Sequence, residues 1–281
     1  MRFGILPPYG ADVVTDPSWM AAFARHADDV GFESIYLGEH LALPDDTAFP
    51  DALETLAFLA GHTTYVRLHT SALILPLHHP VHLAKRVATL DRLSRGRVTI
   101  GVGVGSVREE VRALGVDPAT RGRRADEAIT ALRVLWRDNP ASFAGEFYGF
   151  SEVRSHPRPV TPGGPPIHVG GHSAASATRA GRLADGFHPQ GGLPFDDLDG
   201  DGGPLRVMRE AARSAGRDPA AIEVTVTLPM TAVNQATIEA AERVGVTRIV
   251  LATRPADLDA VRRAMDDFAA NHPMPEECLV R

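Results

Sequence analysis

Residues 67–102 read RLHTSALILPLHHPVHLAKRVATLDRLSRGRVTIGV, and this stretch decides the fold. Its two ends, Arg67–Leu75 and Arg97–Val102, are short apolar runs typical of buried strands. Between them, Pro80–Leu93 repeats its apolar residues at the spacing of an amphipathic helix. A strand, a helix and a second strand in this order form the unit of a parallel sheet, so the stretch predicts an α/β protein.

The same alternation continues on both sides of this stretch. Helical patterns separate further apolar runs, which predict strands at residues 2–6, 34–37, 167–169, 186–188, 222–228 and 248–251. Eight strand and helix units in order favour a closed (β/α)8 TIM barrel. The length of 281 residues suits one barrel domain spanning 1–281, because such a barrel takes ~250 residues. An open, doubly wound sheet is the alternative fold.

Two segments interrupt the alternation. Residues 139–166 are rich in glycine, proline and aromatic residues, and we interpret them as an insertion between strands 4 and 5, with a small hairpin over Phe143–Phe147. Leu193–Pro204 is dense in aspartate and glycine, which predicts a mobile surface loop. We expect both segments, together with the loop Leu43–Pro50, to shape a pocket.

The composition limits the partners and the compartment. A net charge of −6 argues against nucleic acid as the main partner, because that binding needs a basic surface. Cys278 is the single cysteine, so neither an internal disulfide nor a zinc site is expected, and a reducing compartment is indicated. No apolar run approaches the ~20 residues that cross a bilayer, and the N-terminus carries no signal-peptide pattern. We therefore expect a soluble, cytoplasmic protein with no membrane partner.

The first candidate site motif follows the second predicted strand. In a TIM barrel the functional residues lie at the carboxyl ends of the strands, and Glu39 and His40 stand at such an end. Histidine titrates near neutrality and can give or take a proton, so His40 is a candidate catalytic residue. The neighbouring carboxylate of Glu39 is a candidate for orienting it. A surface pair or a structural pair in the core is the alternative interpretation.

Two glycine-rich loops follow the fourth and fifth strands. Glycines there allow a ligand to lie against the backbone, and the free amides at a helix N-terminus favour an anion such as phosphate. Close packing at the barrel rim and an ordinary serine-capped turn are the structural alternatives. Neither loop has the full glycine pattern of a dinucleotide fold. The candidate cofactor-binding residues are Gly103, Val104, Gly105 and Ser106, and Gly170, Gly171, His172 and Ser173.

The sequence lacks the residues that several other kinds of catalysis require. No set of His, Asp and Glu residues has metal-ligand spacing, so we predict no metal. No Gly-x-Ser-x-Gly motif is present to position a nucleophile. Lys85 is the only lysine and lies within a predicted helix, which disfavours a non-redox barrel enzyme acting on a phosphorylated metabolite.

Several ordered motifs together resemble the bacterial luciferase-like monooxygenase superfamily, and the likeness is greatest to its branch of oxidoreductases that depend on the deazaflavin coenzyme F420. The resemblance covers nearly the whole chain. The motifs that carry it are SIYLGEH at residues 34–40, TSALILP at 70–76, TLDRLSRGR at 89–97, GVGVG at 101–105 and PPIHVGG at 165–171.

The resemblance implies a site at the carboxyl face of the barrel. It implies a non-proline cis peptide at Ser71–Ala72 behind the cofactor ring, and the cofactor phosphate at the loop from Gly170 to Ser173. It assigns His40 to proton transfer at the substrate oxygen. The sugar-phosphate dehydrogenase of this family carries a glutamate where this chain has Ser106, so oxidation of a sugar phosphate is in doubt. Superfamily members are often dimers, which implies a homodimer.

The function expected from these observations is an oxidoreductase that transfers a hydride between coenzyme F420 and an unidentified small organic substrate. An FMN-dependent luciferase-like monooxygenase is the nearest alternative, with FMN as the alternative cofactor. A non-catalytic deazaflavin-binding protein is a further alternative. In either enzyme the cofactor supplies the chemistry, and the protein supplies position and electrostatics.

Overall fold

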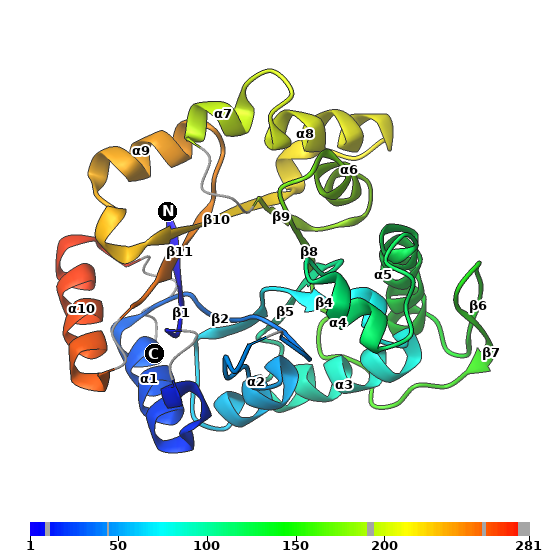
Figure 1. The fold of residues 1–281 in the computed structure, drawn as a ribbon, viewed down its shortest axis with the longest axis horizontal. Helices are drawn as coiled ribbons and strands as arrows, with labels where there is room; N and C mark the ends of the chain where they lie inside the picture. The colour runs from blue at the N-terminus through cyan, green and yellow to red at the C-terminus, as the bar shows by residue number, and fades with distance from the viewer. Residues whose placement is uncertain (9–11, 44, 190–193, 255–256, 275–281) are drawn as a thin grey trace.

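The computed structural model describes residues 1–8, 12–43, 45–189, 194–254 and 257–274. In this part of the chain, eight parallel strands form a closed ring surrounded by helices (Figure 1). The strands of the ring are β1 (Arg2–Leu6), β2 (Ser34–Leu37), β3 (Arg67–Thr70), β5 (Val98–Gly103), β8 (Ile167–Gly170), β9 (Gly186–His188), β10 (Glu223–Pro229) and β11 (Arg248–Ala252). β1 pairs with β11, and β3 pairs with β5, so the ring is continuous. The predicted TIM barrel is confirmed, and the open sheet is wrong.

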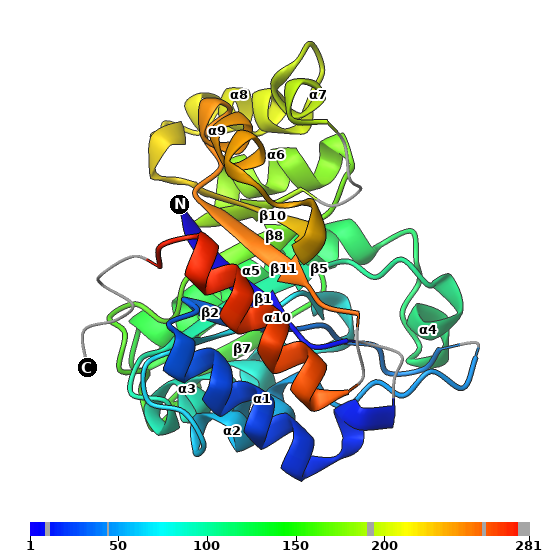
Figure 2. The same cartoon turned by 90° about the vertical axis from the view of Figure 1, so that its left-hand side faces the viewer.

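Helices that connect successive strands cover the outside of the barrel (Figures 1 and 2). Local sequence signals explain their ends. The Asp16 carboxylate accepts hydrogen bonds from the amides of Ser18 and Trp19 and so caps the first helix, which ends at Gly31 with φ 94°. The helices are α1 (Pro17–Val30), α2 (Ala52–Ala60), α3 (Pro80–Leu93), α5 (Arg121–Arg137), α6 (Ala174–Leu183), α8 (Pro204–Ser214), α9 (Gln235–Arg243) and α10 (Leu258–Asn271).

The strand predicted over residues 67–75 is not continuous. β3 ends at Thr70, the Ser71–Ala72 peptide bond is cis, and β4 (Leu73–Ile74) pairs with β5 again. A Cβ atom on Gly101 would lie 2.1 Å from the carbonyl oxygen of Thr70, so β5 approaches the end of β3 at a distance that only glycine permits. The prediction of one strand is wrong because an apolar run alone does not show where a chain leaves the sheet.

The two irregular segments differ from expectation in detail. A hairpin of β6 (Ala141–Ala144) and β7 (Gly149–Val153) projects from the barrel within the predicted insertion (Figure 1). Of the predicted loop Leu193–Pro204, Leu193 lies outside the described residues, and Phe195–Asp199 forms the short helix α7. That part of the loop prediction is wrong, because aspartates in a first turn favour a helix through its dipole.

The centre of the barrel is polar, whereas bulky aliphatic residues fill the centre of most TIM barrels. The rings of Tyr36 and His69 lie 4.4 Å apart, and those of His69 and His168 lie 5.6 Å apart, between different strands. The alternate residues of the same strands, such as Ile35 and Leu68, belong to the apolar core. The buried polar residues of the strands include Ser34, Tyr36, His69, Thr99, His168, His188, Thr225 and Arg248.

Acidification is expected to destabilise the protein through the three buried histidines. Burial lowers the pKa of His168 to about 4 and of His188 to about 3, and it holds the pKa of His69 well below its ordinary value. In the unfolded chain these groups take up a proton near pH 6.5. The unfolded state therefore binds more protons between about pH 6.5 and 4, and stability falls as the pH falls through this window.

The measurement is urea unfolding at pH 8 and at pH 5. Each neutral histidine is expected to contribute about 2 kcal/mol to the difference between the two free energies of unfolding. His168→Gln should reduce that difference by this amount, whereas the same change at His62, in the turn after α2, should leave it unchanged. Equal pH dependence in the wild type and His168→Gln would contradict the assignment.

Candidate active site

One pocket of about 770 Å³ lies where the strands of the barrel end. This volume is in the range of small-molecule sites. The pocket brings together loops from β2, β4, β5 and β8, and every candidate site residue named from the sequence lines it. These residues are Glu39, His40, Ser71, Ala72, Gly103, Val104, Gly105, Ser106, Gly170, Gly171, His172 and Ser173. Their placement is observed, while their roles stay predictions.

The His40 side chain is held by Glu110, which does not itself line the pocket. Its Nδ1 atom lies 3.2 Å from Oε2 of Glu110, and its ring meets the edge of Phe49 with the ring centroids 5.0 Å apart. The imidazole is partly exposed to the pocket. A carboxylate on one ring nitrogen fixes the orientation of the imidazole and leaves Nε2 for another partner.

Glu110 is a functional candidate that the sequence did not reveal. It lies on α4 (Arg108–Ala113), on the same side of the barrel as the loop after β2 (Figure 2). Its side chain is buried, and Oε1 accepts hydrogen bonds from the amides of Leu41 and Ala42 while Oε2 faces His40. Glu109 beside it is exposed, so residue type alone does not distinguish the two.

Glu39 does not orient His40, and this part of the prediction is wrong. The buried Glu39 carboxylate accepts a hydrogen bond of 2.7 Å from the amide of Ile74, and Nε2 of His78 lies 2.9 Å from it. Glu39 therefore holds the backbone that follows the cis peptide at Ser71–Ala72. Glu39 and His40 are adjacent in the chain but meet different partners.

The loop after β8 presents the N-terminus of α6 to the pocket. Gly171 has φ 136°, and a Cβ there would lie 2.9 Å from the Ser176 side chain, so this turn requires glycine. Ser173 caps the helix by accepting a hydrogen bond of 3.2 Å from the amide of Ser176. Amides and the helix dipole at this end favour an anion.

Two arginines that the sequence analysis missed line the same pocket. Arg121 opens α5, and Arg179 lies on α6. Arg179 is already paired with Asp126, while the guanidinium of Arg121 donates to the carbonyl oxygen of Pro118. The charge of Arg121 adds to that of the α6 N-terminus, whereas Asp126 balances the charge of Arg179. Nothing local in the sequence separates these two arginines from the many arginines on the outer surface.

The three segments expected to shape the pocket contribute unequally. Phe49 from the loop after β2 lines the pocket. No described residue of the insertion 139–166 or of residues 194–204 lines it, so the expectation for these two segments is wrong over the described residues. The stretch between α4 and α5 takes their place with Pro118 and Ala119.

The apolar wall of the pocket and its hydrogen-bond donors suit a ligand that consists of a ring and a phosphate group. Ala72, Val104 and Ile74 supply an apolar wall. A Cβ on Gly105 would lie 2.9 Å from Ile74, so glycine is needed for the wall to close. The N-terminus of α6 and the nearby Arg121 supply positive charge for an anion, and we call this part of the pocket the anion end. The described residues contain no group of three His, Cys, Asp or Glu side chains arranged for a metal ion, and none of the described helices could span a membrane.

Two named enzymes are similar to this chain in sequence. The chain is 31% identical over 220 residues to the F420-dependent glucose-6-phosphate dehydrogenase of Kineococcus radiotolerans, covering 76% of this chain and 64% of that protein. It is 34% identical over 182 residues to 4-hydroxyprotoasukamycin monooxygenase of Streptomyces nodosus subsp. asukaensis, covering 62% of this chain and 49% of that protein.

A solved structure shares the fold. The F420-dependent secondary alcohol dehydrogenase in complex with an F420-acetone adduct superposes with a TM-score of 0.80 at 19% identity, over 97% of this chain and 98% of that one. The model of the luciferase-like monooxygenase family matches residues 1–275. Because this match spans the barrel and all the loops that form the pocket, the chain belongs to the luciferase-like monooxygenase family.

Proposed function

We propose that this protein is an oxidoreductase that transfers a hydride between coenzyme F420 and a small organic substrate. The observation that carries the proposal is that His40, held by a carboxylate, lines the same pocket as the Ser71–Ala72 wall and the N-terminus of α6. The F420-dependent relative supports the choice of deazaflavin.

The residues divide into three groups by the part of the cofactor they would hold. The loop from Gly170 to Ser173 and the N-terminus of α6 would bind the phosphate, with Arg121 as a nearby positive charge. Ser71, Ala72 and the loop from Gly103 to Ser106 would flank the ring. A bound deazaflavin supplies the site that accepts or donates the hydride.

His40 would hold the proton that accompanies the hydride. Because Nδ1 faces the Glu110 carboxylate, the neutral imidazole donates from Nδ1 and leaves the lone pair of Nε2 toward the pocket. When a substrate alcohol is oxidised, Nε2 takes the hydroxyl proton. When a carbonyl is reduced, the protonated ring returns that proton to the oxygen, and Glu110 stabilises the charged ring in both directions.

An FMN-dependent monooxygenase is the second candidate function. The monooxygenase relative at 34% identity favours it, and the same anion end would hold the phosphate of FMN. The pocket geometry around His40 is compatible with either ring, so the two candidates differ in their cofactor and their use of oxygen.

Titration of the purified protein with F420 and with FMN tests the proposal. The absorbance and fluorescence of each cofactor report binding, and the expected result is a dissociation constant for F420 at least tenfold lower than that for FMN. Tighter binding of FMN would replace the proposal with the monooxygenase alternative. Failure to bind either cofactor would reject both.

Replacing Glu110 by glutamine is expected to lower turnover by about 10-fold to 100-fold. The charge-assisted hydrogen bonds of a carboxylate contribute about 1.5–3 kcal/mol each, and the amide keeps the shape of the side chain without its charge. Affinity for the cofactor should change less than threefold, because Glu110 faces His40 rather than the anion end. Steady-state kinetics and cofactor titration measure the two effects. Glu109→Gln, on the exposed face of α4, is the matched control and should change neither.

A further inference from the structure

His188 forms contacts with residues of two walls of the pocket. It is the last residue of β9, its side chain is buried, and it does not line the pocket itself. Its Nδ1 atom lies 3.4 Å from Oγ of Ser71, and its main-chain oxygen accepts a hydrogen bond of 3.2 Å from the amide of Gly171. One residue therefore contacts both the wall at the cis peptide and the loop before α6.

The ring of His188 is fixed on its second side as well. Nε2 lies 2.9 Å from Oγ1 of Thr227 on β10, and the ring meets the edge of Tyr36 with the centroids 6.1 Å apart. Burial lowers the pKa of His188 to about 3, so the imidazole is neutral at physiological pH. A neutral ring held at both nitrogens cannot rotate without losing a hydrogen bond in a buried site.

We propose that His188 is a positioning residue that fixes the Ser71 hydroxyl and the Gly171 loop relative to each other, so that one cofactor meets both. The inference rests on the proposed function, in which Ser71 flanks the ring and Gly171 belongs to the phosphate loop. It assigns a role to a residue that touches neither substrate nor cofactor. Ser71 and Gly171 are 100 residues apart in the chain, and His188 is the residue seen to bond to both.

Two substitutions of His188 separate its contacts. Asparagine places a polar atom near the position of Nδ1 and keeps a partner for Ser71, whereas glutamine reaches the position of Nε2 and keeps only the contact with Thr227. Ser71→Ala removes the hydroxyl itself. The dissociation constant for F420 is measured for each variant and for Ser71→Ala combined with His188→Gln.

We expect His188→Gln and Ser71→Ala each to weaken F420 binding by about 5-fold to 10-fold, the worth of one hydrogen bond. The double variant should bind within twofold of Ser71→Ala, because His188 acts through Ser71, and His188→Asn should bind within about threefold of the wild type. A role confined to stability would give neither this non-additivity nor the rescue by asparagine. His168→Asn, a buried histidine outside the pocket, is the matched control and should leave the F420 affinity unchanged.

The outcomes separate the two proposals. If the wild type binds F420 and the effects of the two substitutions multiply, or if asparagine and glutamine act alike, the positioning role is overturned while the proposed function stands. If the wild type binds FMN instead, the same cycle measured with FMN supports the positioning role when the two effects do not multiply and asparagine rescues, and overturns it when they multiply. If it binds neither cofactor, the proposed function fails and the positioning role fails with it.

Discussion

Replacing His40 by alanine is expected to lower the turnover number by about 10²–10⁴-fold, the usual contribution of a positioned acid or base. In the structure the imidazole is partly exposed to the pocket and held at Nδ1 by Glu110, so its Nε2 is the ring nitrogen that can serve the substrate oxygen. Because the anion end of the pocket is built from other residues, the dissociation constant for the cofactor should change less than threefold.

Steady-state kinetics with F420 and a panel of small alcohols and carbonyl compounds would measure the first effect, and cofactor titration the second. His62→Ala is the matched control, because the His62 side chain hydrogen-bonds to the carbonyl oxygen of Phe58 and does not line the pocket. A His40→Ala variant with full turnover would show that His40 is not the proton carrier. If that variant still bound the cofactor normally, the proposed role of the anion end in cofactor binding would stand.

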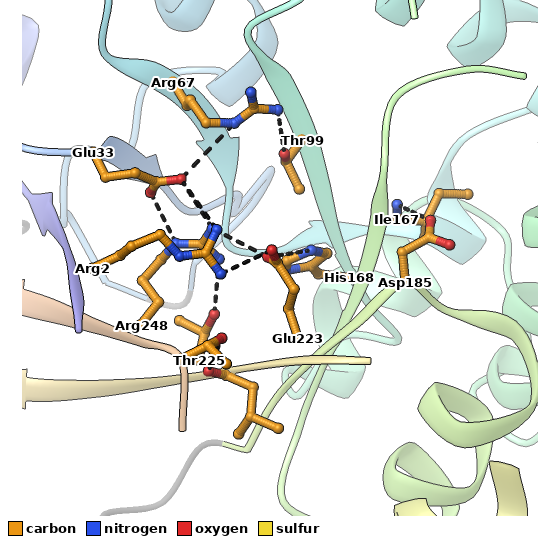
Figure 3. Close-up of polar contacts among 12 residues, drawn as sticks. Arg2, Glu33, Arg67, Thr99, Ile167, His168, Asp185, Glu223, Thr225 and Arg248 are labelled. Carbon is orange, nitrogen blue, oxygen red and sulfur yellow. Dashed lines mark hydrogen bonds and ion pairs between the residues drawn. The ribbon is translucent and has the colours of Figure 1, made fainter. Parts of the chain in front are cut away.

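Replacing Arg248 by methionine is expected to lower the free energy of unfolding by about 3–5 kcal/mol, because it leaves a buried carboxylate without its main partner. The guanidinium of Arg248 makes two hydrogen bonds of 2.9 and 3.0 Å to the Glu33 carboxylate and lies 3.1 Å from Glu223 (Figure 3). Arg248 is only 2% exposed, so water cannot replace the lost contacts.

Urea unfolding at pH 8 measures the change in the free energy of unfolding. Arg206→Met is the control, because Arg206 pairs with Asp201 and Glu210 on the surface, where ion pairs contribute about 1 kcal/mol or less. Arg2 and Arg67 lie 4.0 Å from Glu33 and keep part of the compensating charge (Figure 3). An unfolding midpoint for Arg248→Met equal to that of the wild type would show that these two arginines suffice.

The positions of the strands and helices were predictable because each depends on a local pattern. Apolar runs and helical spacing located the strands of the ring, and Asp16 with Pro17 marked the start of a helix. The polar barrel centre is also visible in the sequence. Apolar Ile35 stands between Ser34 and Tyr36, and apolar Val226 stands between Thr225 and Thr227. In a parallel barrel this alternation means that the polar residues face inward and the apolar residues face the helices.

Part of the pocket wall was predictable for the same reason. Once the strands are known, their carboxyl ends must meet at one face of the barrel. The loops after those ends therefore share a site, whatever their separation in the chain. Glu39, His40 and the two glycine-rich loops were found in this way, and the structure places all of them at one pocket.

The sequence by itself determined the order of the elements, the barrel and the pocket loops that directly follow the strands, because these follow from residue type and short-range spacing. Only the tertiary structure decided which side chains pair with one another. His40 takes Glu110 rather than its neighbour Glu39, and Arg248 pairs with Glu33 from 215 positions away. These choices arise when the ring closes, since closure sets which side chains share a buried space, whatever their separation along the chain.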